Sequence, residues 1–341
     1  MKNDQAPPPA EQIFQLVLGY MPAMALNIVA RLGVADQIEK EPKAIADLAK
    51  AAGVHENALY RLMRALASVG VFHEATGRRF EHTPGSELLR QDHPASIRPM
   101  TVWMSDPFHF RCYADLMNSI QTGQPSAEKT LGQPVFEYFR DNADESEVFN
   151  DAMVSFTNFS IPAILEAYDF SGIQKLVDVG GGHGSVVGRI LQKYSSMRGI
   201  LYDLDHVVAG AKGLLSSLGV ADRCDVVAGN FFDSVPTGGD AYIMKHIIHD
   251  WDDDKCRIIL GHIRQALSGR SNGQLLLLES IVPGLNEPAM SKWIDLEMMI
   301  FPGGRERTEE EFQKLFASAG FKLARITPTK SPLAVIEAVL A

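Results

Sequence analysis

The sequence contains little cysteine, and its cysteines form no recognisable motif. Cys112, Cys224 and Cys256 are the three cysteines among 341 residues, and they are widely spaced, with no Cys-x-x-Cys pair for zinc binding or redox chemistry. A small odd number of scattered cysteines also does not make a disulfide framework. We therefore expect reduced thiols and a cytoplasmic protein.

An excess of positive charge is also missing. The 32 Lys and Arg residues are outnumbered by 42 Asp and Glu residues, which gives a net charge of −10. Such a chain is repelled by a phosphate backbone or an anionic membrane, so we expect neither as a partner. With 46% hydrophobic and 22% charged residues, the composition is that of a globular protein, and the length favours two domains.

One stretch, Gln12 to Ala30, lacks charge altogether. It is long enough to span a bilayer, and Ala23-Met24-Ala25 resembles a signal-peptidase site. The preceding residues argue against both interpretations, because Asp4 and Glu11 outweigh Lys2 and leave no basic region. A helix that is apolar on all sides is more often buried against protein. We expect this helix to form the interface of a homodimer.

Residues 44–82 have the pattern of a winged helix. Two apolar patterns of helical period lie on either side of Gly53-Val54, and two short strand-like segments follow on either side of Ala75–Arg78. Such a shape often binds DNA, but residues 1–100 contain 11 Lys or Arg and 11 Asp or Glu and so carry no net charge. We therefore favour a structural and dimerisation module over a DNA-reading one.

The segment from about Ser96 to Asp169 is again helical in pattern and is rich in aromatic and methionine side chains. We expect most of them in the core and some of them around a flat apolar ligand. These patterns divide the chain into three parts. Residues 1–100 should form an all-helical winged-helix domain with one small hairpin, and residues 101–170 a helical linker that contributes to the ligand pocket. Residues 171–341 should form the last domain.

From Lys175 onward, short apolar runs alternate with helical stretches, which is typical of a doubly wound α/β sheet. The predicted strands are Leu176–Val179, Gly199–Tyr202, Asp225–Ala228, Ala241–Met244, Leu275–Leu278, Phe321–Ile326 and Ala334–Val339. Only the turn Pro328–Pro332 separates the last two, so they should form an antiparallel hairpin. A terminal hairpin is typical of Rossmann-like methyltransferases, whereas a dinucleotide-binding fold ends in parallel crossovers.

The strongest local signal is Leu176–Gly184, in which a strand runs directly into glycines and a helix begins near Ser185. Glycines let the backbone turn tightly and approach a nucleotide. Ser185 stands where the NAD fingerprint requires its last glycine, and Asp178 suits a sulfonium and its amino-acid tail better than a pyrophosphate. Asp203, at the end of the next strand, is placed to accept hydrogen bonds from ribose hydroxyls. We therefore predict a nucleoside cofactor at this loop.

Together with further motifs, the loop resembles the S-adenosylmethionine-dependent small-molecule O-methyltransferases, which include plant caffeate-type, hydroxyindole and bacterial antibiotic-tailoring enzymes. The resemblance runs from end to end and is carried by the winged-helix N-terminus and by four segments, Asp178–Gly184, Gly229–Phe232, Met244–Trp251 and Pro302–Thr308. The last two, with His-Asp-Trp and Pro-Gly-Gly-x-Glu-Arg-Thr, are far more specific than the glycine loop. The resemblance implies S-adenosylmethionine as cofactor and S-adenosylhomocysteine as product.

The resemblance assigns His249 as the base that removes the hydroxyl proton of the acceptor. Methyl transfer to a hydroxyl requires an in-line approach and a positioned base, so one imidazole near the cofactor sulfur meets the main chemical demand. Glu279 and Glu306 match the two glutamates that flank this base in the family. A carboxylate bonded to a ring nitrogen fixes the tautomer and stabilises the imidazolium.

The cofactor residues that the resemblance implies lie on several segments. They are Asp178, Gly180, Gly182, Gly184, Asp203, Asn230, Phe231, Lys245 and Trp251. Phe231 and Trp251 are expected at the faces of the adenine. Asn230 stands where the family usually has Asp. Its carbonyl oxygen still accepts from the adenine amino group, but the charge is lost.

The resemblance also places the acceptor ring between Met153 and Phe156, with Trp103, Met298 and Phe301 as further candidates.

No metal is implied. The acidic run Asp252–Asp254 could suggest a magnesium site, but its position directly after Trp251 favours the N-terminus of a helix, where acidic side chains complement the helix dipole.

We predict a homodimeric O-methyltransferase that acts on a phenolic or similarly acidic hydroxyl of an aromatic small molecule. Two alternatives stay open: the same scaffold diverted to a non-methylating reaction such as decarboxylation, and a winged-helix regulator that senses a ligand. The presence of His249, Glu279 and Glu306 together counts against the first. Salt-dependent DNA binding would favour the second.

Overall fold

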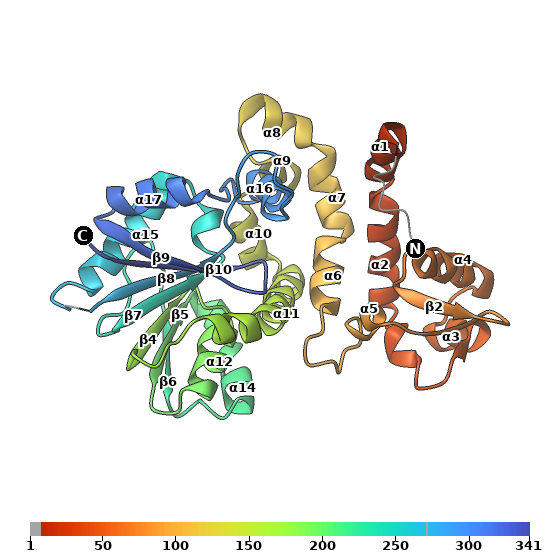
Figure 1. Cartoon of the computed structure of the whole chain (residues 1–341), viewed down its shortest axis with the longest axis horizontal. Coiled ribbons are helices and arrows are strands. Elements are labelled where there is room, and N and C mark those ends of the chain that lie inside the picture. The colour runs from red at the N-terminus through yellow and green to blue at the C-terminus, as the bar shows by residue number, and fades with distance from the viewer. Residues whose placement is uncertain (1–7, 271) are drawn as a thin grey trace. The chain divides into compact units, whose positions relative to one another are not determined.

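The computed structural model describes residues 8–270 and 272–341, and Figure 1 shows the chain from end to end. Lys2 and Asp4, whose charges entered the argument about the N-terminus, lie outside the described residues. The chain folds as two compact units. Unit 1 comprises the residues up to Phe110 together with Asp151–Phe156, and unit 2 comprises Arg111–Asn150 together with Thr157–Ala341.

Unit 1 is mainly helical and contains the predicted winged helix. Its elements are α1 (Pro9–Val17), α2 (Tyr20–Arg31), the 3-10 helix η1 (Ala35–Gln37), β1 (Lys43–Ala44), α3 (Ile45–Ala52), α4 (Glu56–Ser68), β2 (Phe72–Ala75), β3 (Arg79–His82), α5 (Pro84–Glu87), α6 (Arg98–Met104) and the start of α7 (Pro107–Ala114). Both strands of the predicted hairpin are present, but the sheet has a third strand. The two-residue strand β1 pairs antiparallel with β3, which gives the order β1-β3-β2.

Local chemistry sets the turn between the two central helices of unit 1. α3 ends at Gly53, whose φ of 67° is the left-handed conformation that glycine adopts without strain. α4 begins after His55, whose Nδ1 accepts a hydrogen bond from the Ala58 amide at 3.3 Å. Leu59, Met63 and Leu66 then lie on the buried face of α4.

The uncharged N-terminal stretch forms two helices rather than the single one predicted. α1 ends at Val17 and α2 begins at Tyr20, and Gly19, a poor helix former, lies between them. Ile13, Phe14, Leu16 and Val17 on α1 are each more than 60% exposed. Among the described residues, Pro9–Arg31 is the one helical stretch whose length and hydropathy suit a membrane span. An apolar face of this kind is typical of an interaction surface.

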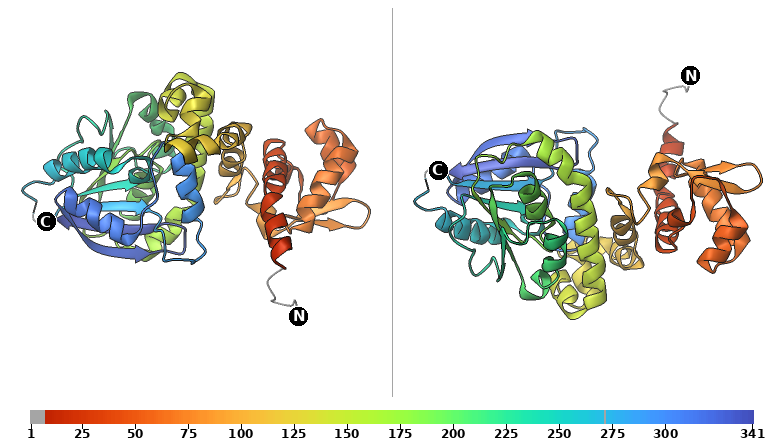
Figure 2. Two further views of the ribbon diagram at one scale, coloured as in Figure 1. Left: turned by 90° about the horizontal axis from the view of Figure 1, so that it is seen from above. Right: turned by 90° about the horizontal axis from the view of Figure 1, so that it is seen from below.

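Unit 2 is a seven-stranded sheet with helices on both faces, as Figure 2 shows from two further directions. Its helices are α8 (Leu116–Thr122), α9 (Ser126–Leu131), α10 (Val135–Asp141), α11 (Ala143–Ala167, of which 151–156 belong to unit 1), α12 (Ser185–Lys193), α13 (Asp205–Val208), α14 (Ala211–Ser217), the 3-10 helix η2 (Ile248–Asp250), α15 (Asp253–Ala266), α16 (Ser291–Ile300) and α17 (Glu309–Ser318). Its strands are β4 (Lys175–Val179), β5 (Arg198–Asp203), β6 (Cys224–Ala228), β7 (Ala241–Lys245), β8 (Gln274–Glu279), β9 (Phe321–Pro328) and β10 (Ala334–Leu340).

The order of the strands is β6-β5-β4-β7-β8-β10-β9. The first five are parallel, and β10 is antiparallel to both of its neighbours, so the predicted α/β sheet and terminal hairpin are confirmed. β10 lies between β8 and β9 and is almost wholly buried. The Rossmann-like architecture therefore has its last strand in the interior of the sheet.

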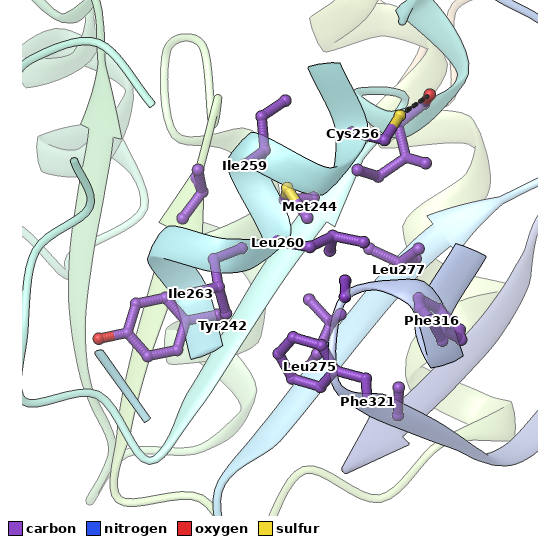
Figure 3. Packing of buried hydrophobic residues seen from close by; sticks show 14 of the residues in the cluster. Tyr242, Met244, Cys256, Ile259, Leu260, Ile263, Leu275, Leu277, Phe316 and Phe321 are labelled. Carbon is purple, nitrogen blue, oxygen red and sulfur yellow. Dashed lines mark hydrogen bonds between the residues drawn. The ribbon is translucent and has the colours of Figure 1, made fainter. Parts of the chain in front are cut away.

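Alternate residues of the strands face opposite helical layers. On one face, Tyr242, Met244, Leu275 and Leu277 pack with the apolar side of α15, as Figure 3 shows. On the other face, the carboxylate of Asp178 reaches the backbone of α12. Such a sheet buried on both sides explains why its strands are continuous apolar runs in the sequence.

The topology places a crevice at the carboxyl ends of the central strands. From β4 the chain crosses to β5 on one side, whereas β7 lies on the other side of β4, so the direction of winding reverses between β4 and β7. Open α/β sheets bind ligands at such a switch point. The residues at these carboxyl ends come from the four neighbouring strands β5, β4, β7 and β8.

Candidate active site

The glycine loop after β4 is held close to the sheet. A Cβ on Gly180 would lie 2.5 Å from the Ile247 side chain, and a Cβ on Gly181 would lie 2.5 Å from Leu201. Gly182, with a φ of 59°, has open space where a Cβ would point. The loop thus packs against the protein on one side and exposes backbone on the other, which is the shape required for a nucleoside to approach the main chain.

The two acidic residues near the loop have different partners. Asp203, at the end of β5, accepts hydrogen bonds from the Gly182 amide at 2.8 Å and from the Leu204 amide at 2.7 Å. Asp178 lies beneath the loop and accepts from the Val187 amide in α12 at 3.2 Å. Burial raises the pKa of Asp203, and it raises the pKa of Asp178 to about 7. Asp178 therefore braces the loop against the helix.

Aromatic side chains surround the next segment of the predicted cofactor site. The rings of Phe231 and Trp251 meet edge to face with centroids 6.3 Å apart. Asn230 folds into a local turn in which its Oδ1 accepts from the Phe232 amide at 3.0 Å. The indole Nε1 of Trp251 is buried without a hydrogen-bond partner among the described residues. A buried donor of this kind fits a polar ligand beside the ring.

His249 is buried in the short helix η2, directly after β7, and carboxylates surround its ring. Nδ1 lies 2.8 Å from Glu306 Oε1 and 3.7 Å from Glu279 Oε2. Nε2 lies 3.4 Å from Asp250 Oδ1. The short contact with Glu306 indicates that Nδ1 carries a proton and donates it, which leaves Nε2 as the nitrogen that exchanges a proton with a ligand. The structure thus brings the three predicted catalytic residues together.

The glutamate at the end of β8 also holds the backbone of the turn. Glu279 Oε1 accepts from the Ile247 amide at 3.1 Å and from the Ile248 amide at 3.0 Å. The second oxygens of Glu279 and Glu306 are buried without a hydrogen-bond partner among the described residues. Two buried carboxylates at one imidazole edge oppose each other's ionisation. Burial raises the pKa of Glu279, and the neighbouring carboxylate of Glu306 acts in the same direction.

The charges around the ring change the pKa of His249. Burial lowers it, but the carboxylates of Glu279, Asp250 and Glu306 outweigh burial and raise it to about 9. Burial raises the pKa of Asp250 to about 7. It lowers that of Lys245, at the end of β7, to about 8, although Glu279 and Asp178 oppose the change. The site is therefore a cluster of coupled acids and bases rather than a single titrating histidine.

The ring of His246 lies next to that of His249. The two rings stack with centroids 4.6 Å apart and planes 15° apart. The φ of His246, 54°, is left-handed, which is uncommon for a residue other than glycine and reflects the sharp turn after β7. Burial lowers the pKa of His246 well below its ordinary value. We infer that His246 stays neutral beside the charged ring.

The segment 304–307 runs directly along this turn. A Cβ on Gly304 would lie 2.0 Å from the carbonyl oxygen of His249, and the Arg305 amide donates to the same oxygen at 2.8 Å. Glu306 bonds the ring of His249, and Arg307 donates to backbone carbonyls of the turn. Four consecutive residues of the Pro-Gly-Gly-x-Glu-Arg-Thr motif therefore lie against the turn that carries the base.

Sequence reasoning missed three residues of this site. Asp250 was passed over although it is next to His249 in the predicted motif, and that adjacency was the available signal. Gly304 and Arg307 belong to the other predicted motif, but their contacts depend on how that segment folds back onto the turn. No spacing in the sequence encodes that approach.

A metal ion has little support from the geometry. Among the described residues, His246, His249 and Glu279 bring possible ligand atoms within 4.8 Å of one another. However, the Nδ1 of His249 is bonded to Glu306, and the Oε1 of Glu279 to two amides. The acidic run after Trp251 begins α15, as predicted. Asp252 caps the helix by accepting from the Lys255 amide at 2.8 Å.

The residues predicted to bind the acceptor lie in both units. Met298, on α16, and Phe301, directly after it, belong to unit 2, where Phe301 is buried beside the ring of Tyr113. Trp103 on α6 is buried in unit 1, and Met153 and Phe156 are half-buried in the part of α11 that belongs to unit 1. Their roles toward an acceptor stay predictions.

Two family models match the chain. Residues 14–92 match an O-methyltransferase dimerisation domain, and residues 113–322 match an O-methyltransferase domain. The first match covers the winged helix, and the second covers the five parallel strands with the His249 turn.

Individual relatives match over nearly the full length. The chain is 39% identical over 333 residues to a phenazine O-methyltransferase of Lysobacter antibioticus, covering 98% of this chain and 97% of that protein. It is 33% identical to the mitomycin biosynthesis 6-O-methyltransferase of Streptomyces lavendulae, covering 96% and 93%. A solved O-methyltransferase from neocarzinostatin biosynthesis, in complex with S-adenosylmethionine and 2-hydroxy-5-methyl naphthoic acid, matches with a TM-score of 0.77 and 29% identity over 94% of this chain and 96% of that one.

Proposed function

Because the chain belongs to the O-methyltransferase family and transfers a methyl group from S-adenosylmethionine to a hydroxyl of an aromatic small molecule, we propose that His249 is the general base of that transfer. The observation that carries the proposal is the bond between its Nδ1 and Glu306 at 2.8 Å. This bond fixes the tautomer whose Nε2 accepts a proton. We assign Glu306 and Glu279 to the orientation and charge stabilisation of the ring.

The residues around the glycine loop fit S-adenosylmethionine. The open space beside Gly182 leaves room for a ribose edge, and the carboxylate of Asp203, which already holds the Gly182 amide, has further acceptor capacity for ribose hydroxyls. The buried indole N–H of Trp251 and the ring of Phe231 offer a polar and an apolar contact for a purine. Gly180, Gly184, Asn230 and Lys245 complete the proposed set, and Asp178 acts beneath the loop.

The bound cofactor supplies an electrophilic methyl group on a sulfonium. The protein's part is to hold the acceptor oxygen in line with that group and to take its proton at Nε2 of His249. The O–CH3 bond forms as the S–CH3 bond breaks, the electron pair of that bond stays on sulfur, and the imidazolium formed at His249 is stabilised by Glu306. Oδ1 of Asp250 lies 3.4 Å from Nε2, the nitrogen proposed to take the proton.

The acceptor that suits this site is a phenol on a flat aromatic ring. The pKa of about 9 at His249 lies close to the pKa of a phenol, near 10, so proton transfer is nearly balanced. In unit 2, Met298 and Phe301 are the proposed contacts of the acceptor ring. For Trp103, Met153 and Phe156, which belong to unit 1, a role toward the acceptor rests on the family resemblance alone.

The match to a dimerisation domain supports a homodimer. We propose that the exposed apolar face of α1 is covered by the second copy, and that the protein is cytoplasmic with no nucleic-acid or membrane partner. The net charge of −10 and the three buried free cysteines support the latter statements.

The proposed function is tested by incubating the protein with methyl-labelled S-adenosylmethionine and a panel of phenols of increasing ring size. We expect labelled aryl methyl ethers, identified by mass spectrometry. Release of carbon dioxide from aromatic acids without consumption of the cofactor would instead support the diverted scaffold. Salt-dependent binding of duplex DNA without any methylated product would support the regulator.

Asp203→Ala should weaken the binding of S-adenosylhomocysteine by about 1.5 to 3 kcal/mol, roughly 10- to 150-fold, because a charged hydrogen-bond acceptor is lost. Part of the loss comes from the Gly182 amide, which the carboxylate holds at 2.8 Å. Asn230→Asp should be neutral or tighten binding, since the bond to the Phe232 amide is kept. Titration calorimetry measures both. Asp225→Ala, at a half-exposed carboxylate on the edge strand β6, is the matched control and should leave the affinity unchanged.

A further inference from the structure

We propose that Arg307 is a positioning residue for the base, acting by fixing both ends of the turn that carries His249. The inference rests on the proposed role of His249 and adds a residue that is outside the proposed catalytic, cofactor and acceptor sets. Arg307 is 1% exposed and is the largest of the fully buried side chains among the described residues. A guanidinium so deeply buried must have its donors satisfied by defined partners.

The partners of Arg307 are the backbone of the turn. Nη1 donates to the carbonyl of Ile248 at 2.9 Å, and Nη2 donates to the carbonyl of Trp251 at 2.9 Å. These carbonyls lie on either side of His249, one residue before it and two residues after it. One rigid planar group therefore fixes both ends of the segment that presents the imidazole.

The guanidinium is itself held from the far side. Asp253, in the first turn of α15, accepts from Nε at 3.2 Å and from Nη2 at 2.8 Å through the same oxygen. The second oxygen of Asp253 accepts from Arg305 at 2.6 Å. The arginine–carboxylate contacts hold the pKa of Asp253 below its ordinary value although burial opposes this. The carboxylate is therefore charged at neutral pH and fixes the plane of Arg307.

The neighbouring residues explain why this anchor matters for the base and not only for the fold. Glu306, directly before Arg307 in the chain, bonds the ring of His249, and the amide of Arg305 bonds the carbonyl of the same residue. A shift of segment 305–307 relative to the turn would change the distance between the Glu306 carboxylate and Nδ1. Arg307 sets that distance because its hydrogen bonds hold segment 305–307 against the backbone of the turn.

The charged and titratable groups that face the ring from each packed element are known from the structure. They are Glu306 from the segment after α16, Glu279 from β8, Asp250 from η2, and Lys245 and His246 at the end of β7. Of these, Glu306 directly precedes Arg307 in the chain, whereas Asp250 lies within the anchored turn and moves together with His249. Loss of the anchor should therefore appear as loss of the Glu306 contact, which lowers the pKa of His249.

The test is Arg307→Lys in the full-length protein. A lysine keeps a positive charge opposite Asp253, but it cannot bridge two carbonyls with a planar fork. We expect kcat for a methylated phenol to fall about 10- to 100-fold, with KM for the acceptor changed less than threefold. We also expect the pKa of His249 to fall by about one unit or more, measured by NMR titration of the histidine-labelled protein and assigned with His249→Ala.

Arg223→Lys is the matched control. Arg223 also donates to backbone carbonyls, those of Leu191, Tyr194 and Met197 at the C-terminus of α12, outside the proposed site. The Arg223→Lys substitution should lower the melting temperature without changing kcat or the pKa of His249. If Arg307→Lys behaves like this control, Arg307 is merely structural and the proposal is overturned.

If Arg307→Lys does not fold, Asp253→Asn takes its place, since it loosens the arginine from the exposed side. It should lower the pKa of His249 in the same direction by a smaller amount, and an unchanged pKa would overturn the proposal. The pKa measurement does not depend on catalysis. Normal turnover in His249→Ala would disprove the base while leaving the positioning of the ring still open to this test.

Discussion

His249→Ala should lose about 10² to 10⁴ in kcat at neutral pH on a phenol that is not activated, which is the usual contribution of a positioned general base. The rate is lost because the variant has no base to remove the proton of the acceptor hydroxyl. A phenol with a pKa near 10 and an ordinary imidazolium near 6.5 differ by about 3.5 units, roughly 5 kcal/mol. At a pKa of about 9, His249 reduces this gap to about one unit, or about 1.4 kcal/mol.

The same values give the sign of the pH dependence. Below a pKa of about 9 the imidazole of the free protein is mostly protonated, so the wild-type rate should rise with pH up to about that value and level off above it. The deficit of His249→Ala should shrink as the pH approaches the pKa of the phenol, because solvent then supplies the phenolate. Steady-state kinetics between pH 6 and about 10 provide the comparison.

The control is a histidine whose two ring nitrogens also have partners but which lies outside the proposed site. His82 in unit 1 contacts Ser86 and the Ile38 carbonyl through its two ring nitrogens, and His82→Gln should leave kcat unchanged. Cofactor affinity should stay close to wild type in His249→Ala, because the base does not hold the nucleoside. Near-normal turnover of the alanine variant at neutral pH would mean that the enzyme works by proximity alone.

Gly304→Ala should lower kcat by about 10²-fold, because a methyl group has no room at this position. Its Cβ would lie 2.0 Å from the His249 carbonyl oxygen, 2.3 Å from the Asp250 carbonyl carbon and 2.6 Å from the Trp251 amide nitrogen. All three are backbone atoms, so no side-chain rotation relieves the contact. The turn that carries the base must move, and overpacking should also cost about 1 to 3 kcal/mol of stability.

Kinetics, cofactor affinity and thermal unfolding separate these effects. The control is Gly261→Ala in the middle of α15, where nothing lies within 4 Å of the added methyl group. Alanine is the better helix former, so this variant should be as stable as wild type or more so, with unchanged kcat. A folded Gly304→Ala that retains wild-type kcat would show that the turn and its neighbouring segment tolerate displacement.

Most of the sheet could be predicted because its strands are short buried runs. Leu275–Leu278 is a continuous apolar segment, and Leu176–Val179 is interrupted only by Asp178; they correspond to β8 and β4. The strand β1 was missed because two residues, Lys43 and Ala44, give no periodic signal. The break between α1 and α2 was missed because the absence of charge dominated the pattern of the stretch.

The sequence predicted which residues stand at the strand ends of the site, but not which atoms they contact. His249 and Glu279 follow adjacent parallel strands, and carboxyl ends of adjacent strands meet at one edge. Asp178 shows the limit of such reasoning. Its place before the glycines predicts a ligand contact, which stays a prediction, and its carboxylate also accepts from the Val187 amide, a contact that the sequence did not reveal. Which way a side chain turns at the end of a strand depends on the following helix, and spacing does not record it.

The position of β10 has a consequence for how the protein is made. β10 pairs with β8 from Ala334 to Val339 on one side and with β9 from Ala334 to Leu340 on the other. Domains usually fold as their segments leave the ribosome, the N-terminal ones first. Here β8, which carries Glu279, has no partner on that side until residues 334–340 have been synthesised. The sheet therefore cannot complete its pairing beside Glu279 until β10 has been made.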